Sequence, residues 1–189
     1  YELAGTSGQL KITQNDSNTQ TYNEKIFNVC SILNGNRLTI GGDHSIGIGS
    51  VLSSLQQHPH TCVIWIDAHP DINTMESSVS KNIHGMPLSF LTGLENKWKW
   101  VNTKPILKFE NLYYFGIRDC DQFEVNLIQK QKINVFRNVS DIINTIKLQK
   151  FSHFHISFDV DSLDPCVMPS TGTRSELGIE FEEIDYLGY

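Results

Sequence analysis

Helical and strand-like apolar patterns alternate along most of the chain, and this alternation limits the folds that it can adopt. Apolar residues recur at helical spacing around residues 22–33, 48–55, 86–94, 121–128 and 139–146. Short apolar runs that predict strands lie between them, at residues 37–40, 62–66, 112–117, 133–136 and 154–158. Such an order is typical of a mainly parallel sheet with helices on both faces. The sequence therefore predicts a three-layer α/β/α fold.

Length and composition predict one domain without a basic or membrane-spanning face. The chain has 189 residues, of which 22–189 are expected to form the domain, whereas residues 1–21 are polar and predict a loop or a ragged end. A net charge of −6 without a basic run argues against nucleic-acid binding. No apolar stretch approaches the ~18 residues that a membrane span needs. The four cysteines stand far apart and no secretory signal is visible, so we expect a reduced, cytoplasmic protein.

Acidic and imidazole side chains gather directly after four of the predicted strands. The segments are GGDHS after residue 40, DAHPDIN after 66, RDCDQFE after 117 and DVDSLDP after 158. Ligands of open α/β sheets bind outside the carboxyl ends of the strands. We therefore expect the four segments to face a common rim.

Six of these side chains have the spacing of a joint site. Residues two apart in an extended segment point the same way, so Asp67, His69 and Asp71 should project together, as should Asp159 and Asp161. His44 supplies a further imidazole, since it follows the strand predicted at residues 37–40 and the two glycines after it. The predicted cluster consists of His44, Asp67, His69, Asp71, Asp159 and Asp161.

Four carboxylates cannot all stay ionised in a dry pocket without cations, because like charges raise one another's pKa. Two divalent ions would balance them, and a donor set of oxygens with two nitrogens suits Mn²⁺ better than a tetrahedral zinc. Two such ions can bridge a water and make hydroxide, which attacks an unreactive carbon or phosphorus. Taken alone, an aspartate after a strand is usually a helix N-cap and a histidine there a loop group. Their joint occurrence favours a functional site.

Five blocks in order resemble the ureohydrolase superfamily. They are GGDHS, DAHPDINT, NIHGMPLSFL, GIRDCDQFE and SFDVDSLDPCVMPSTGT, and the resemblance runs from about Tyr22 to the end of the chain. NIHG with SFL, and the DINT start, resemble arginase rather than agmatinase or formimidoylglutamase. The resemblance implies an arginase-like fold, two Mn²⁺ per subunit, a homotrimer, and a place in arginine metabolism and the urea cycle. The implied reaction converts L-arginine and water to L-ornithine and urea, by attack of a metal-bridging hydroxide on the guanidinium carbon.

The resemblance also assigns roles near the reacting carbon. It implies one manganese held by residues matching His44, Asp67, Asp71 and Asp159. It implies the other held by residues matching Asp67, His69, Asp159 and Asp161. Asp71 would also orient the hydroxide and help pass a proton to the leaving amine. His84 matches a histidine proposed to shuttle protons, and Thr173 matches a threonine near the guanidinium.

Two further groups match the family's grip on the amino acid. Asn73, Ser78 and Ser80 match the loop that holds the substrate carboxylate, which agmatine lacks. Asp121 and Glu124 match the acids that face the α-ammonium, although Asp121 could also cap the next helix.

The chain departs from the family pattern in three respects. Family members are longer, and the acidic residue that clamps the guanidinium lies in their last quarter, so no position here matches it. We expect the chain to be a fragment of a longer one. Lys81 stands where glycine is common, and Arg174 where proline is usual. The alternatives to an arginase are an agmatinase or other guanidino-hydrolase, and a metal-binding member of the family without turnover.

Overall fold

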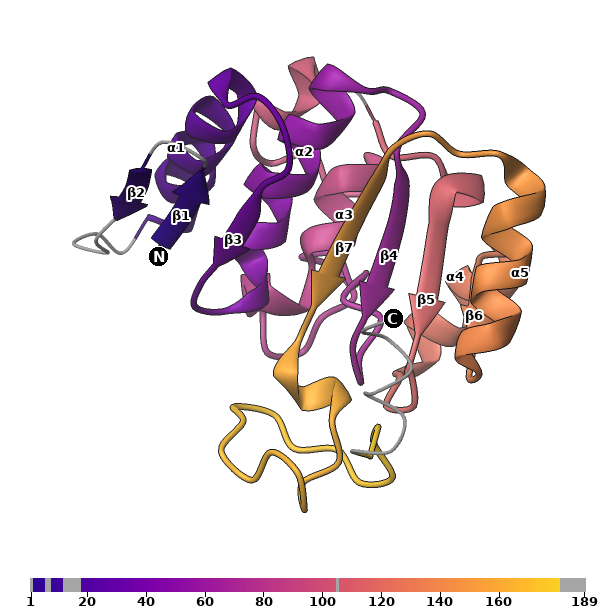
Figure 1. Cartoon of the computed structure of the whole chain (residues 1–189). Coiled ribbons are helices and arrows are strands. Elements are labelled where there is room, and N and C mark those ends of the chain that lie inside the picture. The colour runs from indigo at the N-terminus through magenta and orange to yellow at the C-terminus, as the bar shows by residue number, and fades with distance from the viewer. Residues whose placement is uncertain (1, 6–7, 12–17, 105, 181–189) are drawn as a thin grey trace. The chain divides into compact units, whose positions relative to one another are not determined.

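The computed structural model describes residues 2–5, 8–11, 18–104 and 106–180 (Figure 1). Their contacts form two compact units. Unit 1 consists of Tyr1–Pro59 and Asp71–Leu107, and unit 2 of His60–Pro70 and Lys108–Tyr189. The DAHPD segment therefore contributes to both units.

Unit 1 contains a small antiparallel sheet and three α-helices. The strands are β1 (Glu2–Gly5), β2 (Gly8–Lys11) and β3 (Leu38–Ile40), in the order β2-β1-β3. The helices are α1 (Thr19–Ile32), α2 (Gly47–Gln57) and α3 (Pro87–Thr92). Three short 3₁₀ turns complete the unit: η1 (His44–Ile46), η2 (Ile83–Gly85) and η3 (Val101–Thr103).

Helices α1 and α2 pack closely and hold the turn between β3 and α2 in place. Asn23 of α1 accepts a hydrogen bond at 2.9 Å from the backbone amide of Gly49, and a Cβ atom at Gly49 would collide with the α1 backbone. Ile46 packs against a buried cluster formed by Tyr22, Ile26 and Cys30. This packing fixes η1, which carries His44.

Unit 2 contains a four-stranded parallel sheet. Its strands are β4 (Cys62–Ile66), β5 (Leu112–Phe115), β6 (Asn134–Phe136) and β7 (Phe154–Phe158), in the order β6-β5-β4-β7. Its helices are α4 (Gln122–Gln131) and α5 (Val139–Gln149), with 3₁₀ turns η4 (Phe109–Asn111) and η5 (Val160–Ser162).

The strand order of unit 2 creates a switch point between β4 and β7. From β4 the chain moves outward to β5 and then β6, and after α5 it returns to pair β7 on the other side of β4. In parallel sheets the crevice at such a reversal, beyond the carboxyl ends of the strands, is the usual ligand site. Asp67 and Asp159 are the first residues after these two strands.

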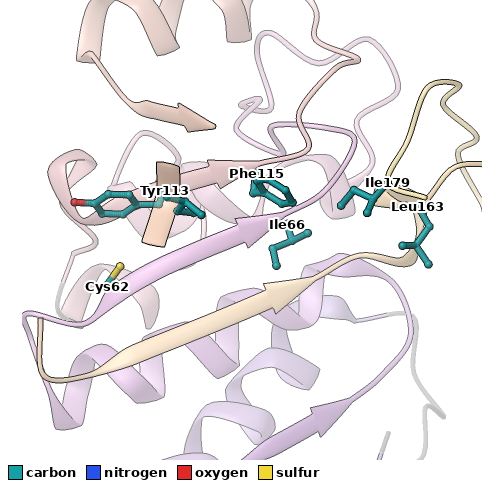
Figure 2. Packing of buried hydrophobic residues seen from close by; sticks show 7 residues of the cluster. Cys62, Ile66, Tyr113, Phe115, Leu163 and Ile179 are labelled. Atoms are coloured by element: carbon teal, nitrogen blue, oxygen red, sulfur yellow. The ribbon is translucent and has the colours of Figure 1, made fainter. Parts of the chain in front are cut away.

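A hydrophobic cluster of unit 2 packs on one face of this sheet. Figure 2 labels Cys62, Ile66, Tyr113, Phe115, Leu163 and Ile179 of this buried cluster. Ile142 of α5 completes the cluster, and Phe136 and Val139 pack against it. Leu163 and Ile179 come from the segment that follows β7, so the core also anchors the loop beside the carboxyl ends of the strands.

The structure confirms the α/β class, the mainly parallel sheet and all five predicted helices. Two expectations are wrong. Residues 1–21 are not a loop throughout, since β1, β2 and the start of α1 lie there. β3 pairs antiparallel with β1, and within the described residues it has no parallel neighbour. None of the helices in the described ranges combines the length and the hydropathy needed to cross a bilayer.

Candidate metal and substrate site

Short hydrogen bonds bend the chain after β4 and after β7. Asp67 Oδ1 accepts from the amide of His69 at 2.7 Å, and Asp159 Oδ1 accepts from the amide of Asp161 at 3.0 Å. An aspartate that bonds the amide two residues on forms a compact turn. The extended geometry expected for these segments is therefore wrong, because turn chemistry replaces the strand directly after Ile66 and Phe158, although the side chains of Asp67 and His69 still come together.

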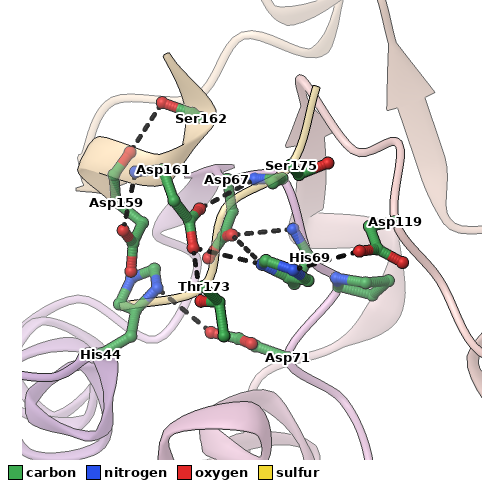
Figure 3. Close-up of polar contacts among 12 residues, drawn as sticks. His44, Asp67, His69, Asp71, Asp119, Asp159, Asp161, Ser162, Thr173 and Ser175 are labelled. Atoms are coloured by element: carbon green, nitrogen blue, oxygen red, sulfur yellow. Dashed lines mark hydrogen bonds and ion pairs between the residues drawn. The ribbon is translucent and has the colours of Figure 1, made fainter. Parts of the chain in front are cut away.

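Within unit 2 the imidazole of His69 lies between carboxylates (Figure 3). Its Nδ1 atom is 3.4 Å from Asp67 Oδ1 and 3.3 Å from Asp161 Oδ2. Asp67 is 1% exposed and Asp161 4% exposed. Two buried carboxylates thus converge on one ring nitrogen.

The two buried carboxylates favour a positive charge at the position between them. Hydrogen bonds to Asp161 and then to Asp67 raise the pKa of His69 to about 10, although burial opposes the shift. In the metal-free molecule the imidazole therefore holds a proton, whose single positive charge offsets part of the charge of the two acids. His69 Nδ1 and one oxygen from each of the two carboxylates all lie within 4.8 Å of one another. Imidazole nitrogen and carboxylate oxygens suit Mn²⁺, which could take the place of the proton.

Other unit 2 contacts hold the two carboxylates in place. Trp65 Nε1 donates to Asp67 Oδ2 at 3.2 Å. The amide of Ala68 donates to Asp161 Oδ1 at 3.3 Å, and the hydroxyl of Thr173 donates to Asp161 Oδ2 at 2.9 Å. Thr173 is thus joined directly to a predicted metal ligand, and partners of this kind fix the orientation of ligating carboxylates.

Asp119 is a site residue that the sequence analysis missed. Its Oδ2 atom is 3.6 Å from His69 Nε2, on the opposite side of the ring from Asp67 and Asp161, and its side chain is 62% exposed. A carboxylate at the second ring nitrogen of a metal-ligating histidine fixes the orientation and protonation of the ring. A signal was present, since Asp119 stands two residues before Asp121 in the RDCD segment.

Gly116 lets β5 approach the first residue after β4. Its φ is +86°, a conformation that L side chains rarely adopt. A Cβ atom at this position would lie 3.2 Å from the backbone oxygen of Asp67. The glycine of the GIRD segment therefore permits the close contact that positions the next loop.

Unit 1 holds the second pair of predicted ligands. His44 Nδ1 is 3.1 Å from Asp71 Oδ2, and both side chains are buried. Asp43 caps the turn that carries His44, because its Oδ1 accepts from the amide of Ser45 at 3.0 Å. Asp71 has φ +50°, which aspartate tolerates better than most residues, and its backbone oxygen accepts from Leu88 of α3 at 3.0 Å. The extended geometry expected for DAHPD thus fails at Asp71 as well.

The loop after Asp71 is tied together by its own hydroxyl groups. Ser77 Oγ donates to Asn73 Oδ1 at 2.8 Å, and the amide of Lys81 donates to Ser78 Oγ at 3.0 Å. Ser78 is buried, whereas Ser80 is exposed and has its hydroxyl 3.4 Å from that of Ser78. Of the two predicted serines, Ser80 is the one presented to solvent, and Ser78 supports the loop.

Lys81 adopts a backbone conformation that usually favours glycine. Its φ is +61°, in the left-handed region that glycine adopts without steric cost. The ammonium group reaches back to the carbonyl of Met75 at 2.6 Å, so the lysine braces the same loop. A lysine here is therefore compatible with the loop conformation.

Glu95 is a second residue that the sequence analysis missed. This buried carboxylate lies just after α3 and accepts from the amide of Met75 at 2.9 Å, which fastens the 73–81 loop to the end of the helix. It also accepts from the amides of Asn96 and Lys97, at 3.0 and 3.1 Å. No sequence pattern marks such an anchor, because its partners are backbone groups.

His84 lies in η2, half-buried, one turn before α3. The amide of Asn73 donates to the carbonyl of the neighbouring Gly85 at 3.2 Å, and η2 also contacts η1. Within unit 1 the His84 turn is thus close to both the 73–81 loop and the turn that carries His44.

Asp121 and Glu124 form the N-terminal cap of α4. Asp121 Oδ1 accepts from the amide of Glu124 at 3.0 Å, and Glu124 Oε2 accepts from the amide of Asp121 at 3.2 Å. Two otherwise unpaired amides are satisfied in this reciprocal arrangement. The capping role considered for Asp121 is therefore confirmed, while the exposed position of Asp121 leaves it accessible to a ligand.

Comparison with known proteins gives a consistent result along nearly the whole chain. The Arginase family matches residues 5–188. Similar curated proteins include the arginase of Glaciozyma antarctica, 37% identical over 168 residues, and that of Neurospora crassa, 41% identical over 170 residues. Each alignment covers 79% of this chain but only 48% and 47% of the respective relative. The chain thus spans about half the length of these relatives.

Solved structures agree in fold. The arginase of Entamoeba histolytica in complex with L-ornithine has a TM-score of 0.80 and 32% identity, over 89% of this chain and 62% of that one. The arginase of Bacillus caldovelox has a TM-score of 0.81 and 28% identity, over 92% of this chain and 66% of that one. With its strand-end acids, its parallel sheet and these likenesses, the chain belongs to the arginase family.

Proposed function

We propose that the whole protein hydrolyses L-arginine to L-ornithine and urea. The observation that carries this proposal is the group in unit 2, where His69 lies between the buried acids Asp67 and Asp161 at the switch point of the parallel sheet. Family membership narrows the chemistry of such a site to hydrolysis at a guanidino carbon.

The proposed cofactor is a pair of manganese ions, held by the six side chains that the motifs assign. They are His44, Asp67, His69, Asp71, Asp159 and Asp161. The donor set supports this choice, because it consists of carboxylate oxygens and imidazole nitrogens without a thiolate. Two bound ions would lower the pKa of water and stabilise negative charge on the oxygen that attacks the guanidinium carbon.

The remaining chemistry falls to side chains of the chain itself. We assign to Asp71 the orientation of the attacking water and the transfer of its proton to the leaving amine. The half-buried imidazole of His84 would exchange protons between the reaction and solvent, because an imidazole can both accept and donate a proton. The Thr173 hydroxyl, already bonded to Asp161, would keep that carboxylate aligned beside the guanidinium.

Recognition of the amino acid would use two loops. Asn73, Ser78 and Ser80 would hold the α-carboxylate, with exposed Ser80 as the direct donor and Ser78 behind it. Asp121 and Glu124 would face the α-ammonium from the start of α4, with exposed Asp121 closer to the ligand. An agmatinase would have no use for the first of these loops.

Ser80→Ala tests arginine against agmatine as the substrate. A hydrogen bond to a charged group is worth about 1.5–3 kcal/mol, so kcat/KM for L-arginine should fall by about 10- to 150-fold. Turnover of agmatine, which lacks the carboxylate, should change by less than about twofold. Val79→Ala is the matched control, because the side chain of this neighbouring residue is 99% exposed. Equal losses on both substrates would contradict the assignment of Ser80.

We further propose that the protein works in the cytoplasm as a homotrimer. The four cysteines all lie within the described residues and are free thiols, which supports a reducing compartment. The trimer is carried over from the family resemblance alone.

A further inference from the structure

Arg118 makes an unusual set of contacts in unit 2, all of them to backbone carbonyl groups. Its Nε donates to Glu176 at 2.9 Å, and its Nη2 donates to Asp161 at 2.8 Å and Ser175 at 2.9 Å. Its Nη1 donates to Ser162 at 3.1 Å and Gly116 at 3.2 Å. The donors of the guanidinium are thus engaged by the chain itself rather than by an acid.

These contacts tie down both ends of the loop that follows β7. The acceptors lie at residues 161–162 and 175–176, on either side of Thr173. Thr173 in turn donates to the carboxylate of Asp161. The guanidinium therefore joins the two ends of the loop formed by residues 161–176. Two site residues of this loop, Asp161 and Thr173, are hydrogen-bonded to each other.

The backbone of Arg118 is also hydrogen-bonded to the turn that follows β4. The amides of Arg118 and Asp119 both donate to the carbonyl of Ala68, at 2.9 and 3.0 Å. Ala68 stands between Asp67 and His69, and its amide donates to Asp161 Oδ1. One residue thus connects the ends of β4, β5 and β7, and every link lies within unit 2.

Only arginine can make this set of bonds. A guanidinium offers five N–H donors in a rigid plane, whereas the lysine ammonium offers three around a single atom. Burial lowers the pKa of Arg118, and the carboxylates of Asp161, Asp164, Asp67 and Asp119 oppose this shift, while a guanidinium stays charged in proteins. The residue therefore also places a fixed positive charge near the acids.

We infer that Arg118 is a positioning residue, which holds the Asp161 carboxylate and the Thr173 hydroxyl in register with Asp67 and His69 without touching the substrate. The consequence for catalysis rests on the proposed function, whereas the consequence for the loop does not. Arg118 therefore has effects that can be measured with and without turnover.

Arg118→Lys in the whole protein tests the inference, with Arg137→Lys as the matched control. Arg137 is an exposed arginine that follows β6 in the same unit. Hydrogen exchange of the metal-free protein should be at least about tenfold faster at the amides of Ser162, Asp164 and Ile179, which bond within this loop. The amides within β4 and β5 should exchange at the parent rate. Arg137→Lys should match the parent at every position.

The same variants are then compared in manganese binding and kinetics. Loss of a residue that orients a metal ligand usually lowers metal affinity or activity by about 10- to 100-fold. We therefore expect Arg118→Lys to bind Mn²⁺ about tenfold more weakly in calorimetric titration. Its kcat for L-arginine should fall by about 10- to 100-fold, with KM within about twofold of the parent. A lower kcat with an unchanged KM indicates displaced catalytic groups, whereas a raised KM would indicate weaker substrate binding.

Two outcomes would overturn the inference. One is loop exchange and manganese affinity equal to those of Arg137→Lys. The other is faster exchange of β4 and β5 as well, in both Arg118→Lys and Arg118→Gln, which would make Arg118 a general folding residue. A parent protein that releases no urea, combined with the predicted exchange and affinity changes, would reject the proposed function and leave the assignment of Arg118 standing.

Discussion

Asp161→Asn in the whole protein should bind about one manganese ion instead of two and should lose urea release by about 100-fold or more. Asparagine is isosteric and keeps one oxygen that can accept from Ala68 or Thr173, as the carboxylate does. It removes the charge that faces His69 at 3.3 Å and one of the two acceptor oxygens, with little change of shape. The loss would therefore report the ligand role rather than the packing. Metal analysis after gel filtration, beside a urea assay, measures both quantities.

Asp164→Asn is the control for this prediction. Asp164 lies three residues further along the same loop, and its carboxylate accepts from the amides of Cys166 and Gly178, at 2.9 and 3.0 Å. Its role is structural, so the variant should keep the parent's metal content even where it melts earlier. Full metal content in Asp161→Asn, or an equal loss in Asp164→Asn, would contradict the ligand assignment.

Removal of metal should lower the melting temperature of the whole protein by on the order of 5–15 °C. Saturation at about 1,000 times Kd stabilises a folded protein by about 4 kcal/mol, and each kcal/mol shifts the melting temperature of a mid-sized chain by about 2–4 °C. The physical reason is that chelation leaves buried acids such as Asp67 and Asp161 with only the His69 proton between them. Calorimetric scans with Mn²⁺ and with a chelator measure the shift.

The size of this shift should follow the proposed ligands. Asp161→Asn should show a clearly smaller difference between the two scans. Asp141→Asn, which changes an exposed acid in the first turn of α5, should show the full difference. A melt that the chelator leaves unchanged in the parent would contradict a structural contribution of the metal.

The sequence predicts the regular elements well because their patterns are local. The stripe at Val139, Ile142 and Ile146 predicts α5, and these residues do pack on the sheet. The continuous apolar run at 62–66 predicts a strand covered on both faces, and it forms the central strand β4. The polar residues 1–21 carry no such pattern, so β1 and β2 could not be predicted from them.

The site was predictable in residue type but not in geometry. The strand-end positions of Asp67 and Asp161 follow from the fold class, and the structure brings both against His69. The turns that do so come from side chain to backbone hydrogen bonds, which an alternation rule for extended chains does not contain. Arg118 and Glu95 were missed because they bond backbone groups that are distant in sequence, which only the folded chain brings together.

The most direct measurement is urea release from L-arginine by the manganese-loaded whole protein, with agmatine as the competing substrate. We expect urea and L-ornithine in equal amounts, a higher kcat/KM for L-arginine than for agmatine, and loss of the activity on chelation. Faster cleavage of agmatine would contradict the proposed substrate, and a manganese-loaded protein that releases urea from neither compound would contradict the proposed enzyme.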